Sequence, residues 1–153
     1  MNIIFRPTNE MDIEKICMLE KEIFGVDAYP KYLVRYLIEN SDFFLVACVD
    51  GEVVGYICGE VKFQKGHIIT LAVDSRFRGR GIGSELLKRF INFLKEKGAK
   101  SVYLEVSVRN RRAIRFYEKH GFKIVGLISK FYNDGSDAYV MALKVVSGGG
   151  VTS

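Results

Sequence analysis

LAVDSRFRGRGIGSELL (residues 71–87) joins an apolar strand pattern to a helical pattern through a segment rich in glycine and arginine. Arginine stands at 76, 78 and 80, and glycine at 79, 81 and 83. The first turn of a helix exposes backbone N–H groups without intrahelical partners, and the helix dipole adds partial positive charge there. Glycines let a ligand approach this backbone closely, and arginines add charge-assisted hydrogen bonds. The segment therefore predicts a site for an anionic group such as a pyrophosphate.

Two other phosphate-binding motifs do not fit this stretch. A dinucleotide fingerprint that starts at Gly79 and Gly81 needs a third glycine where Ser84 stands. A P-loop needs a lysine directly after its last glycine, and this segment has none. A glycine-rich turn on a solvated basic surface is the alternative interpretation.

Hydrophobic periodicity around this stretch predicts a single α/β (α+β) domain. Seven segments read as strands: 2–7, 43–49, 52–63, 67–73, 101–108, 122–131 and 136–145. Four read as helices: 9–24, 31–39, 81–97 and 111–120. Asp50-Gly51 is a typical two-residue hairpin turn. Segment 67–73 is almost uniformly apolar, so we expect it to be buried on both faces.

Composition is that of an ordinary globular domain, with 153 residues, 48% of them hydrophobic and 27% charged. We expect residues 1–146 to form the domain and the glycine-rich segment 147–153 to be a flexible tail. The three cysteines, Cys17, Cys48 and Cys58, show no CxxC pair, which favours free buried thiols in a reducing compartment. No leader or apolar run of about 20 residues is visible, so we expect a cytoplasmic protein without a membrane partner.

Positive charge gathers in the second half of the chain, and the net charge is +5. Such a surplus is compatible with nucleic acid, an acidic partner or a phosphorylated ligand. The basic residues do not alternate with aromatic residues in the manner of an RNA-binding surface, so we do not expect nucleic acid to be a partner.

Three blocks resemble the GCN5-related N-acetyltransferase (GNAT) superfamily: LAVDSRFRGRGIGSELL, YLEVSVRNRRAIRFYEKHGF and FYNDGSDAYVMAL. The first holds the pattern R-x-x-G-x-G at Arg78, Gly81 and Gly83. The resemblance covers about residues 2–145. The three blocks stand in the order and spacing of the N-terminal protein acetyltransferase branch, which includes bacterial ribosomal-protein alanine acetyltransferases and archaeal relatives. The resemblance implies a mixed central sheet of about seven strands with about four helices, splayed at an acetyl-coenzyme A cleft.

That resemblance also implies how acetyl-coenzyme A is bound. Its pantetheine arm pairs with the strand edge at Leu71, Ala72 and Val73. Its pyrophosphate lies on the segment Arg78, Gly79, Arg80, Gly81, Ile82, Gly83 and Ser84. Asn110 matches a cofactor-contacting asparagine, although a plain helix cap explains it equally well. No metal is required.

Acetyl transfer to an amine needs a base and an acid. An α-amine has a pKa of about 8 and must lose a proton before it attacks, and the departing thiolate gains from a proton donor. Tyr117 matches the family's general acid, and a core aromatic is the alternative. Glu105, a carboxylate among apolar strand residues, suits a general base acting directly or through water, and a solvated edge carboxylate is the alternative. We favour no catalytic role for His67 or His120, which lack metal-ligand spacing.

The family resemblance assigns acceptor binding to two segments of this chain. They are the loop after the first long helix (Phe24, Val26, Tyr29) and the final hairpin (Tyr132, Tyr139). The resemblance implies transfer of acetyl to the N-terminal α-amine of proteins, ribosomal proteins among them, in a ternary complex. Lysine side chains, small-molecule amines and a non-catalytic acetyl-coenzyme A sensor are the alternatives.

Overall fold

The computed structural model describes residues 2–146, so the expected tail 147–153 lies outside the described residues. The chain divides into two compact units. The first takes in the chain up to Glu60 together with Ile68–Phe93, and the second takes in Val61–His67 together with the chain from Leu94 onward.

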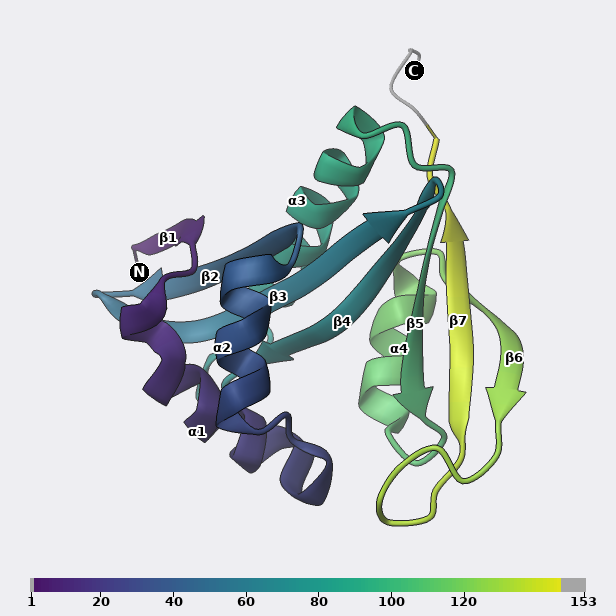
Figure 1. The fold of residues 1–153 in the computed structure, drawn as a ribbon, viewed down its shortest axis with the longest axis horizontal. Coiled ribbons are helices and arrows are strands. Elements are labelled where there is room, and N and C mark those ends of the chain that lie inside the picture. The colour runs from purple at the N-terminus through teal and green to yellow at the C-terminus, as the bar shows by residue number, and fades with distance from the viewer. Residues whose placement is uncertain (1, 147–153) are drawn as a thin grey trace. The chain divides into compact units, whose positions relative to one another are not determined.

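The first unit holds the N-terminal strands and three helices (Figure 1). Its strands are β1 (Ile3–Pro7), β2 (Phe43–Val49), β3 (Glu52–Lys62, up to Glu60) and β4 (Lys65–Val73, from Ile68). Its helices are α1 (Ile13–Phe24), α2 (Lys31–Asn40) and most of α3 (Ile82–Glu96). β2 pairs antiparallel with both β1 and β3. The hairpin turn predicted at Asp50-Gly51 is present, with both residues at positive φ.

Local signals explain where the first helices begin and end. The Asn9 side chain accepts a hydrogen bond from the Met11 N–H and opens a short 3₁₀ turn, η1 (Glu10–Asp12), ahead of α1. The helix predicted over 9–24 therefore starts as a 3₁₀ turn and becomes α-helical at Ile13. α1 ends at Gly25, and Pro30 lies immediately before α2.

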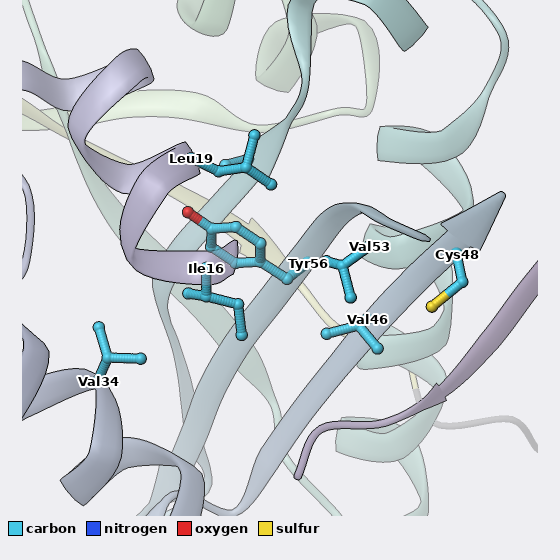
Figure 2. Close-up of a cluster of buried hydrophobic side chains, with 8 residues drawn as sticks. Ile16, Leu19, Val34, Val46, Cys48, Val53 and Tyr56 are labelled. Atoms are coloured by element: carbon cyan, nitrogen blue, oxygen red, sulfur yellow. The ribbon is translucent and has the colours of Figure 1, made fainter. Parts of the chain in front are cut away.

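A buried apolar cluster joins α1 and α2 to the sheet of this unit (Figure 2). Its members come from both helices and from β2, β3 and β4: Ile16, Leu19, Val34, Val46, Cys48, Val53, Tyr56 and Ala72. Phe43, which alternates with the cluster residues along β2, instead contacts Phe90 and Phe93 of α3. Because side chains alternate along a strand, α1 and α2 cover one face of this sheet and α3 the other.

The second unit is built on β5 (Ser101–Ser107), β6 (Lys123–Ile128) and β7 (Ala138–Lys144), with α4 (Arg111–Lys119). β7 pairs antiparallel with both β5 and β6. The start of β4 pairs in parallel with β5, from Lys65 with Ser101 to His67 with Tyr103. The recorded strand order is β1-β2-β3-β4-β5-β7-β6, which confirms the predicted seven-stranded mixed α/β fold.

Two sequence expectations need correction. β4 is not buried on both faces: Ile68, Thr70 and Ala72 are buried, whereas the residues between them are only half-buried. The last two strands are shorter than predicted, because the chain between Ile128 and Ala138 forms a loop in which Asp137 accepts a hydrogen bond from the Lys130 N–H. Within the part of the chain that the structure describes, no helix combines the length and apolar character needed to cross a membrane.

Candidate functional site

The glycine-rich loop lies between a short 3₁₀ turn, η3 (Ser75–Phe77), and the start of α3 at Ile82. Gly79 and Gly81 have φ angles of +78° and +82°, and a Cβ atom built on either would meet nothing within 4 Å. The backbone is therefore bare and open at both positions. The first hydrogen bond of α3 runs from the Glu85 N–H to the Gly81 carbonyl. The backbone N–H groups that precede Glu85 lie in the first turn of the helix, where no carbonyl of the helix can accept from them. This arrangement fits a pyrophosphate.

The three arginines of this stretch differ in their contacts. Arg76 pairs with the buried Asp74 at 2.8 Å and lowers the pKa of that carboxyl, so its charge is already engaged. Arg78 donates from Nε to the Val73 carbonyl at 3.2 Å. The Arg80 guanidinium lies 5.3 Å from the centre of the Phe77 ring. Arg78 and Arg80 are thus the two arginines of this stretch not paired with Asp74, and their contact with a pyrophosphate stays a prediction.

β4 supplies the strand that leads into this loop. Its parallel register with β5 runs as far as His67, and β4 continues from there to Val73. Leu71 and Val73 are half-buried and Ala72 is buried. Ala72 also belongs to the apolar cluster, which fixes this end of the strand.

Glu105 of β5 is paired with a histidine in the second unit. His67 Nε2 lies 2.8 Å from Glu105 Oε1, and their side chains are 24% and 21% exposed. The His67 ring also stacks on Tyr103, with ring centroids 4.4 Å apart. The register explains the contact, because His67 lies directly beside Tyr103 and Glu105 is the next residue on the same face of β5. The carboxylate is thus oriented and still accessible to water.

Tyr117 is buried on α4, at the inward position that the helical period predicts. Its ring meets Phe116 and Phe122 edge-on, at centroid distances of 5.2 and 5.4 Å. Burial, with a smaller contribution from Tyr132, raises the pKa of its hydroxyl well above the ordinary value. Tyr117 therefore stays protonated at neutral pH and can act as a proton donor.

Asn110 caps α4, since its side-chain oxygen accepts a hydrogen bond from the Ala113 N–H at 3.2 Å. This confirms the helix-cap interpretation and leaves the cofactor contact a prediction. In the final hairpin the Tyr132 N–H donates to the Ser136 carbonyl, and Ser136 in turn donates to Asp134. Tyr132 and Tyr139 are both half-buried.

The expected acceptor loop lies between α1 and α2 in the first unit. Phe24 and Tyr29 pack against the apolar cluster, whereas Val26 is exposed. The Tyr29 hydroxyl donates to the Ile69 carbonyl of β4 at 3.4 Å. One of the three predicted residues therefore contacts the strand that leads to the glycine loop.

His67, for which no site role was expected, lies against Glu105. The predicted strands 67–73 and 101–108 do not give this contact, because β4 begins two residues earlier, at Lys65, and that shift pairs His67 with Tyr103. His120 instead holds the Phe116 carbonyl at the end of α4, as a helix-end residue. Among residues 2–146, no group of three or more His, Cys, Asp or Glu side chains is arranged to hold a metal ion.

Comparison with known proteins gives three likenesses and one family match. The sequence model of the acetyltransferase (GNAT) family matches residues 11–122. An N-alpha-acetyltransferase of Sulfurisphaera tokodaii is 43% identical over 145 residues, with 86% of each chain covered. The crystal structure of Ard1 from Thermoplasma volcanium gives a TM-score of 0.88 at 35% identity and covers 94% of this chain and 98% of that one. Naa50 of Arabidopsis thaliana, solved with the bisubstrate analogue CoA-Ac-MVNAL, gives 0.82 at 27% identity and covers 94% and 99%.

Proposed function

The chain belongs to the acetyltransferase (GNAT) family, and from this premise we propose that it transfers the acetyl group of acetyl-coenzyme A to the N-terminal α-amine of proteins. The choice of acceptor is carried by one observation, the 43% identity to an N-alpha-acetyltransferase over most of both chains. The Naa50 structure with an analogue that joins coenzyme A to a peptide supports the same pair of substrates. We assign residues 1–146 to the acetyltransferase domain.

The residues of the first unit fit the cosubstrate, which supplies the activated thioester. The open glycines at 79 and 81 give the pyrophosphate access to the backbone at the start of α3, and Arg78 and Arg80 supply positive charge. Leu71, Ala72 and Val73 supply the strand backbone for the pantetheine arm.

Glu105 is the proposed general base. An α-amine with a pKa of about 8 is mostly protonated at neutral pH, and Glu105 accepts its proton directly or through one water. His67 holds one carboxylate oxygen at 2.8 Å, which fixes the orientation of the other. The freed amine nitrogen then bonds to the acetyl carbonyl carbon while the carbon–sulfur bond breaks.

Tyr117 is the proposed general acid, which gives its proton to the departing sulfur and is reprotonated, through solvent, as the acylated nitrogen loses its second proton. The raised pKa of its hydroxyl keeps that proton available across the working pH range. We expect Tyr117→Phe to lower kcat by about 10²-fold or more, since positioned proton transfer contributes 10²–10⁴-fold. The measurement is steady-state coenzyme A release.

The control for this variant is the neighbouring aromatic Phe116, changed to leucine, which alters the same helix without removing a hydroxyl. Equal losses in the two variants would show that Tyr117 acts only by packing. Because the pKa of Tyr117 lies above its ordinary value, we also expect no loss of wild-type activity from its ionisation below about pH 10.

The function itself is tested by coenzyme A release with a panel of acceptors. The panel holds peptides beginning with Ala, Ser or Met, the same peptides with blocked N-termini, a blocked lysine peptide and a small polyamine. N-terminal sequences of ribosomal proteins belong in it, because such proteins are one proposed set of acceptors. We expect turnover with the free N-termini and none with the blocked peptides. Turnover confined to the lysine peptide or the polyamine would overturn the proposed acceptor.

A further inference from the structure

Glu20 is a buried carboxylate in the first unit to which the proposed chemistry gives no part. It lies near the end of α1, and it is only 2% exposed. Sequence periodicity already places it on the inward stripe of the helix, among apolar residues. A charged side chain at such a position is costly unless its oxygens are hydrogen-bonded.

Three donors from three different segments satisfy Glu20. Oε1 accepts a hydrogen bond from the backbone N–H of Tyr29 at 3.0 Å. Oε2 accepts bonds from the hydroxyl of Tyr56 in β3 and from Oγ1 of Thr70 in β4, both at 2.8 Å. In Figure 2 the Tyr56 hydroxyl lies at the edge of the apolar cluster, toward the helix that carries Leu19. One side chain therefore joins the α1–α2 loop to two strands.

The charge of the buried Glu20 carboxylate does not contribute much to the stability of the fold. Burial raises the pKa of Glu20, although its three hydrogen bonds act in the opposite direction. A carboxylate whose pKa is raised by folding weakens the fold above that pKa, and the cost is relieved as the pH falls toward the unfolded value. The three bonds also hold together the segments that donate them.

The hydrogen bonds of Glu20 hold Tyr29 and the neighbouring strand β4. Tyr29 is held at both ends, by Glu20 at its backbone N–H and by the Ile69 carbonyl at its hydroxyl. Thr70, the next residue of β4, is bound to the same Glu20 carboxylate. Leu71 follows directly, at the start of the segment assigned to the pantetheine arm. A single carboxylate thus sets the spacing between the proposed acceptor loop and the proposed cofactor strand.

We propose that Glu20 is a positioning residue that fixes the acceptor loop, residues 25–30, on β4 and so sets how well a peptide N-terminus is bound for transfer. The proposal rests on the proposed function, because it takes Tyr29 to be an acceptor-binding residue. It assigns no proton transfer to Glu20. Its effect is on acceptor binding, not on the chemical step.

The test compares Glu20→Gln with Glu22→Gln, an exposed carboxylate two residues away on the same helix. Glutamine has one carbonyl oxygen, so it cannot accept from Tyr29 on one side and from both hydroxyls on the other. We expect the KM for a peptide to rise about tenfold, the effect of losing one buried hydrogen bond, with kcat within about twofold of wild type. The KM for acetyl-coenzyme A stays near its wild-type value, and the thermal midpoint falls by no more than the few degrees that one buried hydrogen bond is worth. Glu22→Gln changes nothing.

Amide exchange at Tyr29 gives a second readout that needs no turnover. We expect the Tyr29 N–H to exchange about tenfold faster in Glu20→Leu than in wild type, because leucine has no oxygen to accept from it. Unchanged exchange would overturn the positioning role, even if the wild-type protein acetylated no peptide and the proposed function itself failed. Faster exchange with an unchanged peptide KM, in an active enzyme, would overturn the link to acceptor binding.

A second variant guards against loss of folding. Tyr56→Phe keeps the ring in the core and removes one of the donors to Oε2. We expect it to raise the peptide KM in the same direction as Glu20→Gln and by less. A fall in thermal midpoint accompanied by equal changes for both substrates, in either variant, would show that the cluster only stabilises the fold.

Discussion

Glu105→Gln is expected to lower kcat/KM for a peptide N-terminus by about 10²–10⁴-fold, the range that positioned general bases contribute. Glutamine has nearly the same shape as glutamate. Its carbonyl oxygen can take the place of Glu105 Oε1, which lies 2.8 Å from His67 Nε2. It cannot accept a proton from the amine. The loss therefore reports the chemical step, and steady-state coenzyme A release measures it.

The matched control is Glu118→Gln, which makes the same change at an exposed carboxylate beside Tyr117 on α4. We expect it to retain wild-type activity. Acetyl-coenzyme A should bind Glu105→Gln with unchanged affinity in a calorimetric titration, because no cofactor contact is assigned to Glu105. Activity within about twofold of wild type would assign the base elsewhere, since a lost general base costs far more.

Gly81→Ala is expected to weaken acetyl-coenzyme A binding by about 10- to 100-fold, the loss of one or two charge-assisted hydrogen bonds. Gly81 has a φ of +82°, a conformation that alanine adopts only with strain. Relief of that strain turns the neighbouring N–H groups away from the pyrophosphate. A titration of the purified protein with acetyl-coenzyme A measures the change.

The fold provides a close control in Gly51, in the β2–β3 turn. It has the same φ of +82°, and a Cβ atom there would also meet nothing within 4 Å. Gly51→Ala and Gly81→Ala should therefore each cost about 1 kcal/mol of stability, measured by urea unfolding, from backbone strain alone. Only Gly81→Ala should weaken cofactor binding. Equal effects on binding would show that the loop acts through stability and not through contact.

Most of the fold was predictable from local patterns because most elements have a clear period and clear ends, although the last two strands were predicted too long. Helix-end residues such as Asn9, Gly25 and Asn110 lie where the structure needs them. The alternation of β5, with Val102, Leu104 and Val106 buried and Glu105 half-buried between them, is also confirmed. These are properties of short segments, which sequence periodicity describes directly.

The contacts that periodicity could not predict join segments far apart in the chain. The pairing of His67 with Glu105 spans 38 residues and depends on the exact parallel register of β4 and β5. The bond from Thr70 to Glu20 spans 50 residues. The three donors to Glu20 come from a loop and two strands, and only the tertiary structure brings these segments together. The roles assigned to the site residues stay predictions until the variants above are measured.

The most direct test of the account uses one peptide that carries both kinds of amine, a free N-terminal alanine and an internal lysine. The protein is incubated with this peptide and acetyl-coenzyme A, and tandem mass spectrometry locates the added acetyl group. The account predicts acetylation of the α-amine, with the lysine unmodified. Acetyl found on the lysine alone, or no acetylation by protein that binds acetyl-coenzyme A, would contradict it.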